Sequence, residues 1–129
     1  MIKAEDLRIG DIVRYGKNTI TILAVHANGG VCFTDGKDQL YAEDVLLEPI
    51  LLTPEILEKN GWKKRTEGWY FMMISKYMYL SVEFGYENGI RVFLKRATDG
   101  IYVKLNIANN VHELQHILWA LGKDANLKI

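Results

Sequence analysis

Cysteine and proline are scarce in this chain. Cys32 is the only cysteine, so no disulfide can form within the chain. Such sparing use of cysteine is typical of the reducing cytoplasm, where we expect the protein to reside. The two prolines, Pro49 and Pro54, lie close together, and no Pro-rich or Ser-rich linker is present. Any division into domains must therefore occur without a long flexible linker.

Long apolar runs are also absent. The longest apolar runs span a few residues, far short of the roughly 20 that a membrane-spanning helix needs. The first residues, from Met1 to Asp6, do not have the composition of a signal peptide. We therefore expect no membrane association.

Neither sign of charge is in excess. The chain has 16 Lys and Arg residues and 16 Asp and Glu residues, so no overall field draws it to nucleic acid or to an anionic membrane. Residues 1–48 carry five basic and eight acidic side chains, and residues 49–129 carry eleven and eight. An anionic ligand would therefore be expected on the second part of the chain.

The fingerprints of common enzyme classes are missing as well. The sequence contains no Walker loop, no dinucleotide-binding glycine pattern and no serine nucleophile elbow. Its acidic residues are scattered, with no pair that can be assigned to one cleft. We therefore expect a non-enzymatic protein without a cofactor.

Short β-strand patterns fill residues 1–48. A turn at Gly10-Asp11 leads into a strand that ends near Tyr15, and residues 18–27, 31–34, 39–41 and 45–47 are the further expected strands. Four or five short strands in so few residues predict a small SH3-like barrel. Such barrels bind peptides, bind nucleic acid or have a purely structural role, and the net charge of −3 favours the structural role.

A short helix and an antiparallel sheet are expected after this region. Thr53 is a suitable N-cap and Pro54 a suitable first helical residue, which predicts a helix over 54–60. The alternation of apolar and polar residues then predicts strands near 62–65, 69–74, 77–84, 90–95 and 101–105, with a hairpin turn at Asn88-Gly89.

The clearest helical pattern covers residues 110–121. Apolar residues recur there at three- and four-residue steps, Asn110 and Glu113 form a variant of the capping box, and Gly122 can end the helix. The sheet has one apolar face that needs a cover, and the helices at 54–60 and 110–121 are the available candidates. We therefore predict an α+β fold with two tightly joined domains. Residues 1–48 form the barrel, and residues 49–129 form an antiparallel sheet packed by two helices.

This last helix also contains a metal-binding motif. His112 and His116 lie four residues apart, and Glu113 occupies the position of the general base in zinc hydrolases. A catalytic zinc needs a third protein ligand, and the extended motif is interrupted by Trp119 and Gly122. Helical geometry points the histidines away from the leucine stripe, so we interpret them as part of an outward polar face and keep zinc binding as an alternative.

Aromatic and basic side chains alternate on the polar face of the expected sheet. Such a face can stack and neutralise single-stranded nucleic acid. The alternatives are that Tyr and Lys are here ordinary residues of exposed strands, or that the barrel packs on this face. The candidate interaction face consists of Tyr77, Tyr79, Arg91, Phe93, Lys95, Tyr102 and Lys104.

Three blocks resemble a known group of proteins. They read LRIGDIV from Leu7, EPILLTPEILEKNGW from Glu48, and VHELQ from Val111 with WALG from Trp119. In this order they resemble a family of small uncharacterised proteins from Bacteroides-type bacteria, their phages and prophages. The family has no assigned activity, so the resemblance implies no catalytic residues. At the position of His116 the family usually has Asn, which implies that the histidine pair is particular to this chain.

Three functional hypotheses follow. The leading one is a phage- or prophage-related accessory protein that acts through protein contacts. The second is weak binding of single-stranded nucleic acid by the aromatic and basic sheet face. The third is a zinc-dependent hydrolase built on His112, Glu113 and His116.

Overall fold

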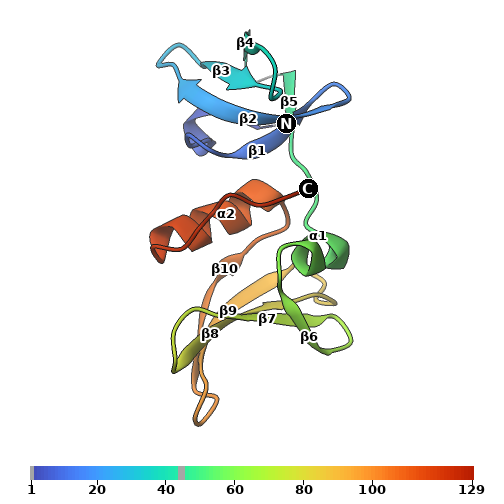
Figure 1. Ribbon diagram of the computed structural model, residues 1–129, viewed down its shortest axis with the longest axis vertical. Helices are drawn as coiled ribbons and strands as arrows, with labels where there is room; N and C mark the ends of the chain where they lie inside the picture. The colour runs from blue at the N-terminus through green and yellow to red at the C-terminus, as the bar shows by residue number, and fades with distance from the viewer. Residues whose placement is uncertain (1, 44–45) are drawn as a thin grey trace. The chain divides into compact units, whose positions relative to one another are not determined.

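The chain folds into two compact units (Figure 1). The computed structural model describes residues 2–43 and 46–129. Unit 1 comprises Met1–Leu51 and Asn110–Leu127, and unit 2 comprises Leu52–Asn109 and Lys128–Ile129. Both units are rich in antiparallel sheet, and each contains one α-helix, so the predicted α+β class is confirmed.

Unit 1 is built on a five-stranded antiparallel sheet. A short 3-10 helix, Ala4–Asp6, precedes the strands β1 (Ile12–Tyr15), β2 (Asn18–Val25), β3 (Gly30–Thr34), β4 (Gln39–Glu43) and β5 (Leu47–Glu48). The strand order is β4-β3-β2-β1-β5, with β4 and β5 at the edges, so the sheet does not close into a barrel within the described residues. The expected strand over 45–47 is present from Leu47 onward, and Val45 lies outside the described residues.

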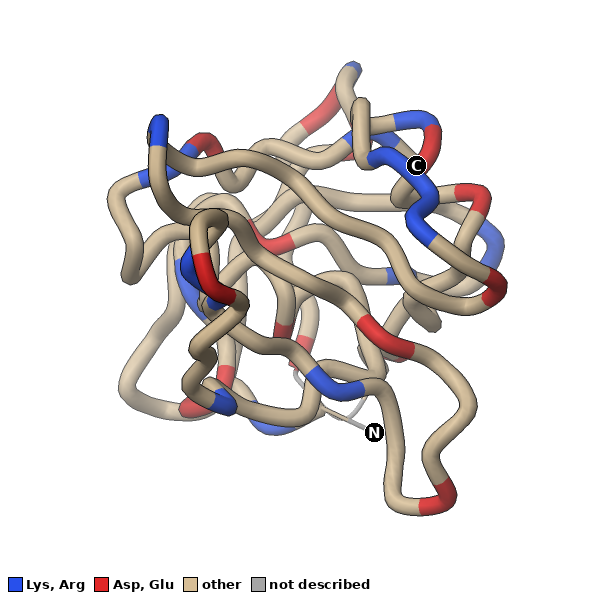
Figure 2. Tube along the Cα trace, turned by 90° about the horizontal axis from the view of Figure 1, so that it is seen from below, with Lys and Arg blue, Asp and Glu red and all other residues tan. Residues whose placement is uncertain are grey.

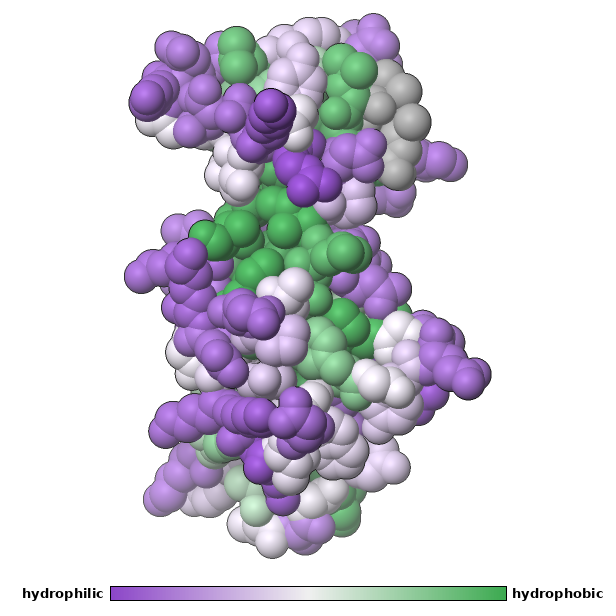
Figure 3. All heavy atoms as spheres, turned by 90° about the vertical axis from the view of Figure 1, so that its right-hand side faces the viewer, coloured by the Kyte–Doolittle hydropathy of each residue, from purple (hydrophilic) through white to green (hydrophobic). Residues whose placement is uncertain are grey.

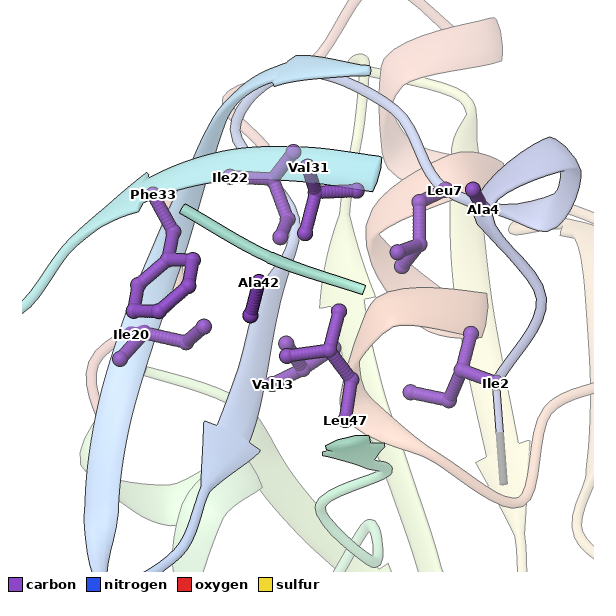
Figure 4. Packing of buried hydrophobic residues seen from close by; sticks show 10 residues of the cluster. All are labelled: Ile2, Ala4, Leu7, Val13, Ile20, Ile22, Val31, Phe33, Ala42 and Leu47. Carbon is purple, nitrogen blue, oxygen red and sulfur yellow. The ribbon is translucent and has the colours of Figure 1, made fainter. Parts of the chain in front are cut away.

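The core of unit 1 lies on one side of this sheet. Alternate residues of β2 and β3 point inward, because successive side chains of a strand face opposite sides (Figure 4). The N-terminal segment adds three further apolar side chains. The cluster contains Ile2, Ala4, Leu7, Val13, Ile20, Ile22, Val31, Phe33, Ala42 and Leu47.

The helix α2 (Val111–Ala120) belongs to unit 1, which corrects the predicted domain division. The sequence pattern indicated a helix with one buried face, and Val111, Leu114 and Leu118 are indeed buried. The helix contacts β1, and the hydrogen bonds on that side come from its polar residues Gln115 and His116, which bind Ile12 and Asp11. The sequence pattern did not predict this association, because an apolar stripe shows that a helix has a buried face but not which unit the helix joins.

Unit 2 contains the predicted meander. The helix α1 (Pro54–Lys59) is followed by β6 (Lys63–Thr66), β7 (Trp69–Met73), β8 (Met78–Glu83), β9 (Arg91–Arg96) and β10 (Tyr102–Ile107), paired in the order β10-β9-β8-β7-β6. Thr53 caps α1 by accepting a hydrogen bond from the Ile56 amide at 3.3 Å, as expected. Helix α1 lies on the apolar face of the sheet, where Tyr70 donates a hydrogen bond to Glu58.

Two local expectations for unit 2 have different outcomes. The predicted hairpin is present, since β8 pairs with β9 antiparallel, and Asn88-Gly89 lies in the connection between Glu83 and Arg91. The alternation over 101–105 assigns Ile101 and Val103 to the apolar face that needs a cover, but both are 60% exposed, and β10 is an edge strand with a neighbour on one side only. Within residues 2–43 and 46–129, no helix has the length and apolar character that crossing a membrane requires.

Candidate functional site

A groove in unit 1 lies between the turn before β1 and the side of α2 that carries Gln115, His116 and Trp119. Its volume is about 790 Å³, and apolar atoms make up most of its walls. The residues that line it come from the N-terminal segment, β2, α2 and the segment after α2. They are Glu5, Leu7, Arg8, Ile9, Gly10, Asp11, Thr21, Gln115, His116, Trp119, Ala125 and Asn126.

The turn formed by residues 8–11 makes one wall of the groove, and its conformation is held by hydrogen bonds. The amide of Arg8 donates to Asp11 Oδ2 at 2.8 Å, and the amide of Asp11 donates back to the Arg8 carbonyl at 3.1 Å. Gly10 has a φ of 94°, a left-handed conformation that favours glycine, and its amide donates to the Ile22 carbonyl. The turn is therefore held in one shape on the surface of the sheet.

Gln115 joins this turn to α2. Its side-chain oxygen accepts a hydrogen bond from the Ile12 amide at 2.8 Å, and its nitrogen donates to the carbonyls of Gly10 at 3.0 Å and Ala125 at 2.8 Å. Both side-chain N–H groups are thereby used, and Gln115 itself is buried. One amide side chain thus connects the turn, the helix and the C-terminal part of unit 1.

His116 lies next to Gln115 and pairs with a buried carboxylate. Its Nε2 is 2.6 Å from Oδ2 of Asp11, whose side chain is 3% exposed, whereas the His116 side chain is 24% exposed. A carboxylate that orients a partly exposed imidazole can support general base chemistry. Among the described residues that line the groove, Thr21 is the one with a hydroxyl or thiol side chain that could act as a nucleophile.

Large exposed side chains lie on the turn of residues 8–11 and on α2 next to it. Ile9, at the tip of the turn, is 75% exposed, and Trp119, on α2, is 64% exposed. The guanidinium of Arg8 lies over the Trp119 ring at 4.9 Å from its centroid, a cation–π contact. The groove therefore combines a rigid backbone with apolar and aromatic groups open to solvent.

The zinc motif is placed differently from our expectation. His112 is 6% exposed, so our interpretation that both imidazoles belong to an outward polar face is wrong for this residue. Glu113 accepts hydrogen bonds from the amide and the side-chain nitrogen of Asn110, at 3.1 and 2.8 Å, and so serves the helix cap. In the part of the chain that the structure describes, no three His, Cys, Asp or Glu side chains are grouped so that they could hold a metal ion.

The candidate face of unit 2 is a packed layer of side chains. The pairing of β7, β8, β9 and β10 brings Tyr79, Phe93, Lys95, Tyr102 and Lys104 to the same side of the sheet. Phe71 also lies on this side. Phe71 makes an edge-on ring contact with Tyr79, and Phe93 makes one with Tyr102. As a result, Tyr79 is only 8% exposed and Phe93 only 7% exposed.

Lys95 lies at the centre of this layer and is already paired. Its ammonium group is 2.7 Å from Oε2 of Glu83, which is buried and also accepts hydrogen bonds from Ser81 and Tyr86. The rings of Trp69, Phe93 and Tyr102 surround the same ammonium at 5.1–5.9 Å. Lys95 thus stabilises the layer and offers little free charge to a ligand.

The remaining predicted residues do not complete an open binding face. Tyr102 and Lys104 are exposed on β10, whereas Tyr77 precedes β8 and contacts Lys76. Arg91 lies over the ring of Tyr86 at 4.0 Å. The structure brings together Tyr79, Phe93, Lys95 and Tyr102, but their mutual packing leaves few free ring faces for stacking.

The charges of the molecule are dispersed. Figure 2 shows positions of both signs interspersed along the trace. Figure 3 shows hydrophilic residues over much of the visible face, around a continuous hydrophobic area. Unit 1 nevertheless has six Lys and Arg residues against ten Asp and Glu residues, and unit 2 has ten against six. The net charges are therefore −4 and +4 for the two folded units, compared with −3 and +3 for the two predicted domains.

Sequence reasoning missed most of the groove. It assigned no role in a site to Arg8, Ile9 or Gln115, placed Asp11 only in a turn, and noted Trp119 only where it interrupts the extended zinc motif. Gly10-Asp11 predicted the turn, but nothing in the pattern predicted that a glutamine about a hundred residues later would bind it. Comparison with protein-family models, curated proteins and solved structures finds no match to the chain.

Proposed function

We propose that the chain is a non-enzymatic accessory protein that binds a protein partner in the groove of unit 1. One observation carries this proposal. Ile9 and Trp119 are exposed, and the hydrogen bonds of Asp11 and Gln115 hold the backbone that carries Ile9 in place. A phage or prophage setting, which the resemblance implies, is part of the same proposal.

The exposure of Ile9 and Trp119 indicates a binding surface because the backbone of the turn is held in place. Apolar side chains on a mobile loop can turn away from water, whereas those on a fixed frame keep their surface hydrated until a partner covers it. A pre-formed surface also loses less conformational entropy on binding. Trp and Arg are enriched among residues that dominate binding energy, and here Arg8 and Trp119 are stacked side by side.

The geometry also indicates which partner chemistry fits. The groove has mostly apolar walls, and its buried charge, Asp11, is already paired with His116. The complementary partner is therefore an apolar side chain, or a short row of them, rather than an ion. Arg8 at the rim can add a contact to a carboxylate or a carbonyl of the partner.

The arrangement of strands supports the finer prediction of an SH3-like fold for unit 1. Five consecutive strands with the fifth paired to the first, through Tyr15 and Leu47, follow the strand order of SH3-like barrels. Peptide binding at exposed aromatic residues is a common use of that fold. This parallel is an analogy, and the proposed function depends on the groove itself.

The experiment uses affinity purification from the producing bacterium with three forms of the tagged full chain. These are the wild type and the variants Ile9→Ser and Trp119→Ala. We expect a defined protein that the wild type retains and that both variants lose. With that protein purified, either substitution should weaken binding roughly 30-fold, the effect of losing a contact worth about 2 kcal/mol.

The matched control is Leu40→Ser, because Leu40 is also exposed and apolar but lies on β4, away from the groove. It should bind the partner as the wild type does. The proposal fails if no protein distinguishes the groove variants from Leu40→Ser, or if the purified partner binds all four forms equally.

The two other hypotheses remain predictions with their own tests. Nucleic-acid binding would have to use Tyr102 and Lys104, so titration of single-stranded DNA at low and high salt should show affinity that Lys104→Gln lowers. A zinc hydrolase requires stoichiometric zinc in protein prepared without a His tag, and zinc near zero would end that hypothesis.

A further inference from the structure

We propose that the free edge of β10 binds an extended, acidic segment of a protein partner as an additional strand. This surface belongs to unit 2 and uses none of the groove residues. It is therefore independent of the proposed function. The argument rests on the backbone of β10, on its exposed side chains and on the charge around it.

The backbone of β10 has unused hydrogen-bonding groups. Its one neighbouring strand among the described residues is β9, so its other edge is free. The Arg96 amide donates to the Ile101 carbonyl at 2.9 Å, and backbone groups along an antiparallel strand alternate between the two sides. The amides of Tyr102 and Lys104 consequently point away from β9. An added strand would pair with them.

The exposed side chains of this edge favour such pairing. Tyr102 is 61% exposed and Val103 is 60% exposed, so β10 presents apolar surface on both faces of the sheet. The opposite edge, β6, carries three consecutive basic residues, Lys63 to Arg65, and all four of its residues are exposed. Runs of charge are a common protection of edge strands against unwanted pairing. β10 has a single charge, that of Lys104, and the register shift in its pairing with β9 comes after Lys104, so residues 102–104 lack protection of both kinds, by charge and by a bulge.

Charge selects the kind of partner. Unit 2 has four more basic than acidic residues. Near β10, Lys95 is paired with Glu83 and Arg96 with Asp99, whereas Lys104 has no ion-pair partner among the described residues. An incoming strand with Glu or Asp on the Lys104 side would be attracted, and one with Lys or Arg would be repelled.

The test uses the full chain and a short capped peptide of alternating Glu and Val, followed by NMR. We expect the peptide to shift the amide signals of Tyr102 and Lys104 and to slow their hydrogen exchange. A matching peptide of alternating Lys and Val should bind at least about tenfold more weakly, since only the charge differs.

Three variants separate backbone pairing from charge. Lys104→Pro removes an outward N–H, which an edge strand tolerates, and should abolish the shifts. Lys104→Glu keeps that N–H and should reverse the preference between the two peptides. Lys63→Gln, on the opposite edge, is the matched control and should bind both peptides as the wild type does. If Lys104→Pro does not fold, Lys104→Glu alone still decides the question.

Several outcomes would overturn the proposal. They are equal binding of the two peptides, shifts centred on β6 or β4 instead of β10, and unchanged binding by Lys104→Glu. Signals of β10 that move with protein concentration in the absence of peptide would show that a second copy of the chain occupies the edge. The acidic-partner proposal would then be wrong.

Discussion

Buried polar side chains in this protein differ in whether their polar atoms are satisfied. Asp11 is bound by the Arg8 amide and His116, and Glu83 accepts hydrogen bonds from Ser81, Tyr86 and Lys95, which offsets the cost of burying the two carboxylates. His112 is buried too, but its Nδ1 has no hydrogen-bond partner among the described residues. Burial lowers the pKa of His112. The carboxylates of Asp11, Glu113 and Asp6 oppose this shift, and the neighbouring His116 adds to it. His112 therefore favours the neutral form in the folded protein.

The lowered pKa of His112 predicts how the free energy of unfolding changes in acid. Because the pKa of His112 is lowered in the folded state, the unfolded chain takes up the proton first as the pH falls below about 6.5. The free energy of unfolding should then fall by up to about 1.4 kcal/mol per pH unit from this group. Urea unfolding of the wild type and of His112→Leu, at about pH 7.5 and about pH 5.5, measures the difference. Equal losses in the two proteins would contradict the prediction.

At the scale of the element, α2 shows which parts of a helix the sequence determines. Its bounds, its N-cap at Asn110 and its end before Gly122, which has a φ of 71°, all agree with the sequence pattern. These features depend on residues within a few positions of each other. The contacts of Gln115 with Gly10 and Ile12 depend on tertiary structure, and they were not predicted.

We predict that Gln115→Ala destabilises unit 1 by about 1–3 kcal/mol. The substitution leaves the Ile12 amide and the Gly10 carbonyl without their partner, and buried polar groups without partners are costly. Thermal unfolding followed by circular dichroism gives the change. Gln39→Ala is the matched control, because Gln39 is exposed on β4 and should alter stability by less than about 0.5 kcal/mol. Similar losses in the two variants would mean that the Gln115 contacts contribute nothing.

At the scale of the whole molecule, the chain alternates between two units. It leaves unit 1 after Leu51, returns at Asn110 and ends in unit 2, where Lys59 and Asn60 of α1 and its C-cap hold the last two residues. Each unit has its own buried residues, such as Leu114 in unit 1 and Leu80 in unit 2. Because most contacts lie within a unit, we predict that a cavity made in one unit destabilises that unit first.

Two equivalent substitutions test this prediction. Leu114→Ala and Leu80→Ala each remove the same side-chain atoms at a site that is fully buried, and each should cost about 2–5 kcal/mol. We expect hydrogen exchange to accelerate mainly in β1–β3 for Leu114→Ala and mainly in β7–β9 for Leu80→Ala. Equal acceleration across both units by either variant would show that they unfold as one cooperative unit.

The sequence by itself determined the local structure of this protein. Glycine turns, caps and apolar periods located both α-helices and nearly all the strands, because these signals act between residues close in the chain. Tertiary structure alone decided that α2 joins the N-terminal sheet, that His112 is buried, and that Lys95 is held by Glu83. It also decided that Ile9 and Trp119 border one groove. These outcomes depend on which surfaces pack together, and no local pattern encodes that choice.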